Sequence, residues 1–169
     1  MQYIMKIDGG MDVNQNDYLT IVLKRFPKVE NIQLDSLVVK SIYEERFEIE
    51  WLATKLKVFS FITYMSKIDF DDIRNYSVAC MDYALKNYKG LPRGLQNGVV
   101  AFNVLVSENV SEQAIAFANK RPKKHFSAFE MPIIFDLSKE QIFFYRDTPL
   151  WGKIYYEYFR EYIEKNFNV

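Results

Sequence analysis

The chain has 169 residues, 22 basic and 22 acidic side chains, 49% hydrophobic residues and a single cysteine. This length and hydrophobic content exclude a largely disordered chain, and the balanced charge excludes a global basic field that would gather nucleic acid or an anionic membrane. No segment approaches the roughly 20 apolar residues of a membrane span, and one cysteine cannot form an intramolecular disulfide. We therefore expect one soluble domain over residues 1–169 in the reducing cytoplasm, with no membrane partner.

The N-terminal elements are predicted from polar segments and helix boundary signals. Residues 1–13 contain a Gly-Gly pair and form either an edge strand or a flexible segment. A helix begins at Asn16 or Asp17, either of which can cap it, and ends before Pro27.

Three strands are predicted in the next part of the chain, which lacks glycine and proline up to residue 89. Residues 37–44 are rich in β-branched side chains, residues 47–53 alternate between apolar and polar, and residues 55–64 are apolar on both faces. Neither joint has the usual hairpin residues, so one longer, bent strand remains an alternative to two of these three.

The remaining elements alternate between helices and buried strands. Helices are expected over 69–88, from Ser111 to the residues before Pro122, and from Thr148 to Phe167. Strands are expected over 99–106, 131–136 and 141–146. The order predicts an α/β fold, with α+β as the alternative: one mixed sheet of about six strands flanked by about four helices. The early strands form a meander, and helical crossovers bring the later strands into the sheet.

The element order over residues 14–107 is helix, three strands, helix, strand, and it resembles the core of PD-(D/E)XK nucleases. That resemblance implies a carboxylate followed by X-Lys on the third strand. Here the third strand carries Lys55-Leu-Lys57, with a lysine at the carboxylate position. No active-site residue of the nucleases is therefore carried over to this chain.

The densest acidic group is formed by Glu44, Glu45, Glu48 and Glu50. Glu48 and Glu50 project from the same strand face, so they could hold Mg²⁺ with a third oxygen ligand, or they could belong to a solvated face. The simple alternation explains the pattern, so we predict no metal and no cofactor.

The chain has one histidine and one cysteine, which limits the metal sites and nucleophiles that it can form. His125 is the only histidine, which excludes zinc sites built from two histidines, and Cys80 lies mid-helix on a predicted core stripe.

A basic cluster around Pro122 is the strongest candidate site. Arg121, Lys123, Lys124 and His125 stand next to Phe126. They either bind an anion, with the aromatic ring stacking on the ligand, or form a solvated helix end that complements the helix dipole.

Three further residues complete the candidate binding site. Arg93 belongs to a glycine-containing loop that lacks a phosphate-binding fingerprint. Glu130 precedes a buried strand and, if it points inward, needs a partner such as Arg93, Lys124 or His125. Trp151 opens the last helix and could form one wall of a pocket.

Three functional hypotheses follow. The first is a non-enzymatic binding module that uses residues 121–126 to bind an anionic ligand or an acidic protein partner. The second is a divergent hydrolase or nuclease that combines Glu48, Glu50 or Glu130 with Lys57, Lys124 or His125. The third is a homodimer formed through aromatic side chains of the last helix and the last hairpin.

Overall fold

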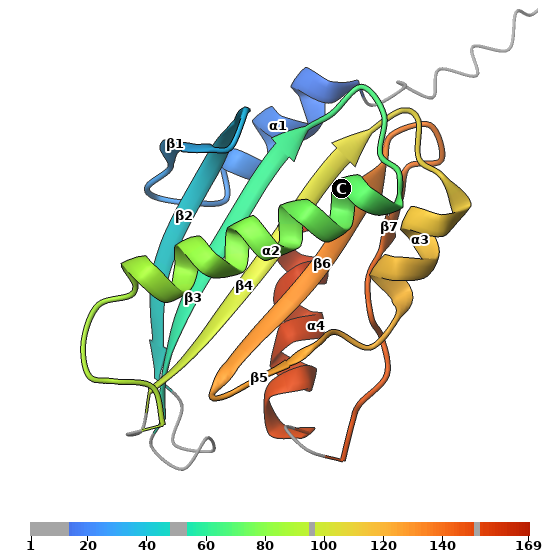
Figure 1. Ribbon diagram of the computed structural model, residues 1–169. Helices are drawn as coiled ribbons and strands as arrows, with labels where there is room; N and C mark the ends of the chain where they lie inside the picture. Colours follow the sequence, from blue (N-terminus) through green and yellow to red (C-terminus); the bar gives the residue numbers. More distant parts are fainter. Residues whose placement is uncertain (1–13, 48–53, 95–96, 151–152) are drawn as a thin grey trace, which may run out of the picture.

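The computed structural model describes residues 14–47, 54–94, 97–150 and 153–169, which form one mixed β-sheet with helices on both faces (Figure 1). The elements in chain order are α1 (Gln15–Leu23), β1 (Glu30–Leu34), β2 (Leu37–Phe47), β3 (Lys55–Tyr64), α2 (Phe70–Asn87), β4 (Asn97–Ser107), α3 (Glu112–Asn119), β5 (Lys124–His125), β6 (Ala128–Asp136), β7 (Gln141–Phe143) and α4 (Lys153–Phe167). The predicted α/β class with a single mixed sheet is confirmed. Within the described ranges, no helix is long and apolar enough to cross a membrane.

The sheet order is β1-β2-β3-β4-β6, and β5 and β7 both pair with the far edge of β6. Strands β1, β2 and β3 are antiparallel neighbours, whereas β3, β4 and β6 are parallel and are joined through α2 and α3. This arrangement confirms the predicted meander followed by helical crossovers. The β5 strand pairs with the beginning of β6, and β7 pairs with its end.

Two hydrophobic cores lie on opposite faces of the sheet. Helices α2 and α3 cover the near face in Figure 1, and α1 and α4 cover the far face. Every residue of β4 is buried because this central strand is covered on both sides. Alternate β4 side chains enter the two cores: Phe102 faces α4, and Leu105 faces α2 and α3.

Helix starts follow local capping chemistry. Asn14 caps α1 by accepting hydrogen bonds from the amides of Asn16 and Asp17, so the cap lies two residues before the earlier of the predicted positions. Asp69 and Asp72 form a reciprocal capping box at the start of α2. Residues 148–150 are not helical, so the last helix does not start after Thr148, whose hydroxyl instead accepts a hydrogen bond from Arg160.

The early strands differ from the prediction. The β1 strand was missed because its exposed, polar sequence lacks a strand pattern, and its hairpin turn uses Asp35 at φ 50°. The β2 strand continues through Phe47, so the predicted break between the 37–44 and 47–53 strands does not exist. The rest of the predicted 47–53 strand lies outside the described residues. Residues 1–13 also lie outside them.

Candidate functional site

Two loops pack against each other at the end of the sheet where β4 and β6 begin. The guanidinium of Arg93, in the α2–β4 loop, donates a hydrogen bond of 2.9 Å to the carbonyl of Phe126, in the β5–β6 turn. The Phe126 ring lies directly over Gly94, where a Cβ atom would stand 2.7 Å from the ring. Ser127 adds a 2.9 Å hydrogen bond from its hydroxyl to the carbonyl of Asn97.

These contacts explain two unusual backbone positions. Gly94 has φ +86°, a conformation that glycine adopts without strain, and its bare Cα makes room for the ring. Ser127 has φ 47° because Phe126 and Ser127 form the two-residue turn between the paired residues His125 and Ala128. The turn therefore holds Phe126 at the surface, where 74% of the residue is exposed.

The basic end surface consists of Arg93, Arg121, Lys123, Lys124 and Phe126. Arg121, Lys123 and Lys124 are exposed, and none forms an ion pair with a carboxylate among the described residues. An exposed cation without an internal partner keeps its charge available for an external anion. This segment of the chain therefore carries exposed cations on both sides of Pro122 and an exposed aromatic ring at Phe126.

His125 and Glu130 contact each other through their side chains. The Nε2 atom of His125 lies 3.2 Å from Oε2 of Glu130, whose side chain is 6% exposed. Both side chains project from the α2 and α3 face, since His125 pairs with Ala128 and Glu130 lies two residues further along β6. Glu130 thus points inward, and its recorded partner is His125 rather than Arg93 or Lys124.

An ion pair between a buried lysine and an exposed glutamate joins β2 and β3. The Lys57 side chain is 5% exposed, and its ammonium lies 2.7 Å from Glu45 Oε1, which also accepts a 2.9 Å hydrogen bond from Tyr43. Gly90, at φ +110°, closes over the lysine. Burial and, secondly, the hydrogen bond to Glu45 raise the pKa of Tyr43 to about 12. Sequence reasoning missed this pair, although Lys57 shares a strand face with two buried phenylalanines.

The Lys57–Glu45 pair and the His125–Glu130 contact lie in one row across the sheet but do not form one site. The register places Lys57 beside Val99, Val99 beside Ala128, and Ala128 beside His125. Three strand spacings separate Lys57 from His125 by about 14 Å, and both intervening side chains are apolar. The acid–base groups of the hydrolase hypothesis are therefore split into separate pairs.

Metal and thiol candidates receive no support from the described residues. Within them, no three histidine, cysteine or carboxylate side chains are placed to hold a metal ion, and Glu48 and Glu50 fall outside them. Cys80 is buried in the core beneath α2, and burial raises the pKa of its thiol. A thiol of this kind is a packing group rather than a nucleophile.

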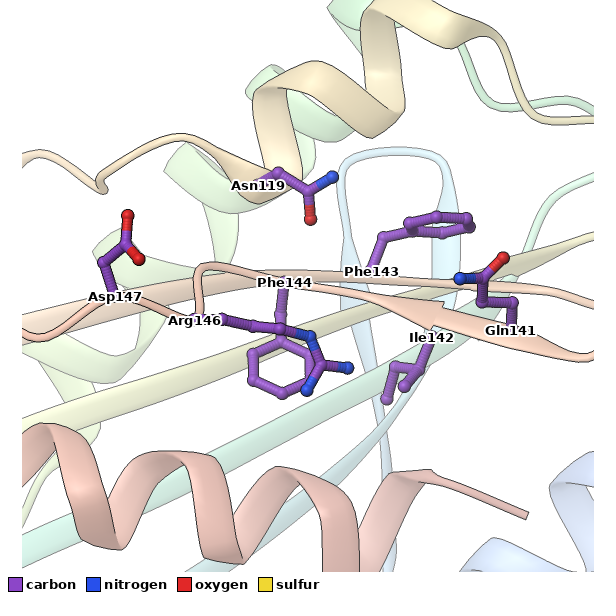
Figure 2. Close-up of a pocket in the computed structure, with 7 residues that line it drawn as sticks. All are labelled: Asn119, Gln141, Ile142, Phe143, Phe144, Arg146 and Asp147. Carbon is purple, nitrogen blue, oxygen red and sulfur yellow. The ribbon is translucent and has the colours of Figure 1, made fainter.

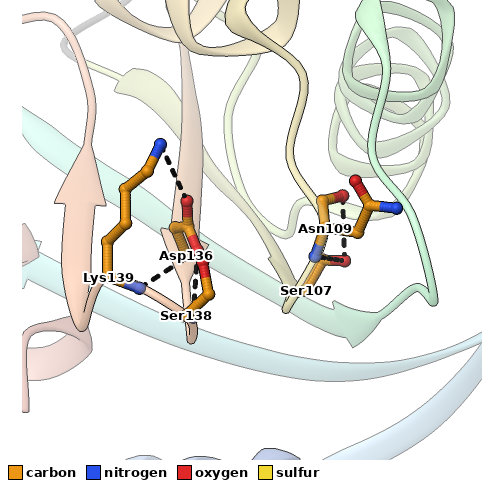
Figure 3. A network of polar contacts seen from close by, with 5 residues as sticks. All are labelled: Ser107, Asn109, Asp136, Ser138 and Lys139. Carbon is orange, nitrogen blue, oxygen red and sulfur yellow. Dashed lines mark hydrogen bonds and ion pairs between the residues drawn. The ribbon is translucent and has the colours of Figure 1, made fainter.

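The opposite end of the sheet holds a polar network that is satisfied internally (Figure 3). Asp136, at the end of β6, accepts hydrogen bonds from the backbone and hydroxyl of Ser138 and from the amide of Lys139. The Lys139 ammonium lies 3.4 Å from the same carboxylate. Asp136 therefore stabilises the β6–β7 turn, and its lone pairs are used within the fold.

The Glu45 pair predicts a pH-dependent contribution to stability. The hydrogen bond from Lys57 is the main cause that holds the pKa of Glu45 below its ordinary value. A lowered folded-state pKa stabilises the protein above the unfolded pKa of about 4.3, and this contribution disappears as pH falls through the folded pKa. We expect Glu45→Gln to be less stable than the parent near neutral pH, and the difference to vanish in acid.

Urea unfolding of both proteins at several pH values measures this difference. Glu157→Gln, at an exposed position on α4, is the control that should show no such trend. A deficit of Glu45→Gln that stays constant as the carboxylate is protonated would contradict the prediction.

The structure separates the predicted site residues into three groups. Arg93 contacts Phe126, and the exposed Arg121, Lys123 and Lys124 lie in the segment that leads from α3 through β5 to Phe126. His125 and Glu130 contact each other, and Trp151 lies outside the described residues. Sequence reasoning missed the contact between Gly94 and Phe126, for which the glycine itself was the available signal.

Comparison of the chain with protein-family models, curated proteins and solved structures found no match.

Proposed function

We propose that the chain is a non-enzymatic binding module whose basic end surface docks an acidic segment of a protein partner. The observation that carries this proposal is the exposure of Arg121, Lys123 and Lys124, without carboxylate partners among the described residues, in the segment that leads to the exposed Phe126. The hydrogen bond from Arg93 to the Phe126 carbonyl holds the two loops together. A surface ordered in advance loses less conformational entropy on binding.

A protein segment fits this surface better than a small ligand or a nucleic acid. The two cavities described in the structure are lined by other residues, beside β7 and beside β1 and β2, whereas small ligands favour concave sites. Nucleic-acid affinity depends on many phosphate contacts, and this chain has net charge zero and only four cationic residues in the basic end surface. An acidic segment with one apolar side chain would use both the cations and Phe126.

The proposal is tested by titrating ¹⁵N-labelled protein with three synthetic probes: a Glu/Leu peptide, the matching Gln/Leu peptide and oligothymidylate. We expect the Glu/Leu peptide to shift amide signals of residues 93–94 and 121–127. Lys124→Glu should weaken this binding by about tenfold, because it replaces an attraction with a repulsion.

Lys67→Glu is the matched control, since Lys67 is exposed beyond the other end of β3 and the substitution changes net charge equally. If both substitutions weaken binding of the Glu/Leu peptide equally, the effect comes from the change in net charge rather than from this surface, and the proposal is overturned. Binding of oligothymidylate in preference to the Glu/Leu peptide would also overturn it.

A further inference from the structure

A cavity of about 220 Å³ lies beside β1 and β2 and shares no residue with the basic end surface. Three segments line it: Lys28 and Glu30 at β1, Ser41 and Tyr43 of β2, and Lys89 after α2. The strand register pairs Glu30 with Ser41, so the two side chains stand next to each other on one face of the sheet. This is the face that α2 covers, because Tyr43, two residues along β2, packs against the core beneath α2.

Two polar groups at this cavity have no partner among the described residues. Ser41 is only 8% exposed, and its hydroxyl forms no hydrogen bond within the described ranges. The Lys89 ammonium is exposed and forms no ion pair with a described carboxylate. Because buried hydroxyl groups are normally hydrogen-bonded, an unpartnered one in the wall of a cavity indicates an acceptor on a ligand.

We propose that this cavity binds a small monocarboxylate, whose carboxylate group accepts a hydrogen bond from Ser41 and faces the Lys89 ammonium. Two lysines and one glutamate give the lining residues a net charge of +1, which a single carboxylate neutralises. A doubly charged phosphate would leave an excess negative charge beside Glu30, which already pairs with Lys28 at 2.7 Å. The volume is below that of sites for drug-sized ligands, so the cavity suits a ligand with a few carbon atoms.

The walls of the cavity are held in place by contacts outside it. The Tyr43 hydroxyl donates a 2.9 Å hydrogen bond to Glu45, and the Tyr43 ring lies 4.8 Å from that of Phe59. The backbone of Lys89 also hydrogen-bonds to Tyr43, which holds the start of the α2–β4 loop against β2. The ligand therefore meets walls that need little rearrangement, and this limits the entropic cost of binding.

The larger cavity, of about 350 Å³ beside β7, differs in its charges (Figure 2). Its cation, Arg146, forms an ion pair of 2.7 Å with Glu164 and lies 4.1 Å from the centre of the Phe144 ring. Asp147 also lines this cavity, so its lining residues have no net positive charge. An arginine that is engaged within the fold offers less to an external anion, and we therefore assign the carboxylate to the cavity beside β1 and β2.

Titration of the ¹⁵N-labelled chain with butyrate at constant ionic strength tests this proposal. We expect saturable shifts of the amide signals of residues 28–30, 41–43 and 88–90, with a dissociation constant of about 1–10 mM for so small a ligand. Ser41→Ala should raise the dissociation constant by about tenfold, because it removes a hydrogen bond to a charged group. Lys89→Gln should raise it by about threefold, because solvent screens an exposed ammonium. Since Lys89 is exposed, this second variant keeps the test valid even if Ser41→Ala destabilises the fold.

Lys86→Gln is the matched control, because Lys86 is exposed in the last turn of α2 and the substitution changes net charge equally. This variant should bind butyrate like the parent. Equal weakening by Lys86→Gln and Lys89→Gln would trace the effect to net charge and overturn the proposal. Butylammonium, which carries the opposite charge on the same carbon chain, should cause no saturable shifts at the cavity. A parent chain without saturable butyrate shifts, or one that binds inorganic phosphate more tightly than butyrate, would also overturn the proposal.

One further variant separates this site from the basic end surface. Lys124→Glu, which should weaken binding of the Glu/Leu peptide, should bind butyrate like the parent. Butyrate shifts confined to residues 121–127 would assign the carboxylate to the basic end surface and overturn the cavity proposal. Failure of the Glu/Leu peptide to bind would leave the butyrate result unaffected, so the two proposals fail independently.

Discussion

Replacing Phe102 by alanine should lower the free energy of unfolding by about 3–5 kcal/mol. Phe102 is fully buried in the middle of β4 and lies at the centre of the aromatic core beneath α4. Its ring stacks on Tyr162 at 4.5 Å and meets Phe159 edge-on at 5.8 Å. The substitution removes these contacts and leaves a cavity that packed strands cannot close. Urea unfolding measured by circular dichroism gives the change directly.

Phe126→Ala is the matched control for this prediction. Phe126 is 74% exposed, so the loss should stay within about 1 kcal/mol even though its ring covers Gly94. Comparable losses from the two substitutions would contradict the assignment of Phe102 to the core and of Phe126 to the surface. Phe126→Ala also separates stability from binding, because it should weaken binding of the Glu/Leu peptide while the protein stays folded.

Asn103→Val should raise the free energy of unfolding by about 1–3 kcal/mol. Asn103 is fully buried in β4, and within the described residues neither its side-chain oxygen nor its nitrogen has a hydrogen-bond partner. An unpaired buried amide carries its full desolvation cost, which a branched apolar side chain does not. Valine also fits a central strand better than asparagine.

Asn97→Val provides a control with the opposite sign on the same strand. Asn97 is also buried, but its side-chain nitrogen donates a 2.9 Å hydrogen bond to the carbonyl of Leu91. Valine there removes the donor and should destabilise the protein by about 1–2 kcal/mol. Equal losses from both substitutions, measured by urea unfolding, would show that the Asn103 amide is hydrogen-bonded in solution.

Much of the fold could be predicted because its signals are local. The apolar run that became β4, the aspartates that cap α2 and the proline before the basic loop each act on neighbouring residues. The meander and the crossovers followed from element order alone. The β1 strand escaped prediction because its residues are stabilised by pairing with β2, and an exposed edge strand needs no apolar pattern.

The basic end surface was only half predictable. Most of its cations are adjacent in sequence, so they could be recognised from the sequence alone. Because a buried glutamate needs a partner, His125 was also predicted as one of three possible partners of Glu130. Arg93 and Phe126 are 33 positions apart, and their contact depends on the parallel register of β4 and β6. Gly94 marked a position where the backbone could need room, but nothing in the sequence indicated that the Phe126 ring would lie over it.

Residue type and short-range spacing were enough to predict the fold class, the start of α2, the Ser111 cap of α3 and the charged character of the 121–126 loop. Tertiary structure alone decided that Lys57 meets Glu45, that Asn103 is buried without a partner among the described residues, and that β7 has an open edge. These features depend on strand register and on the packing of distant segments. A shift of one residue would send the same side chains to the other face of the sheet.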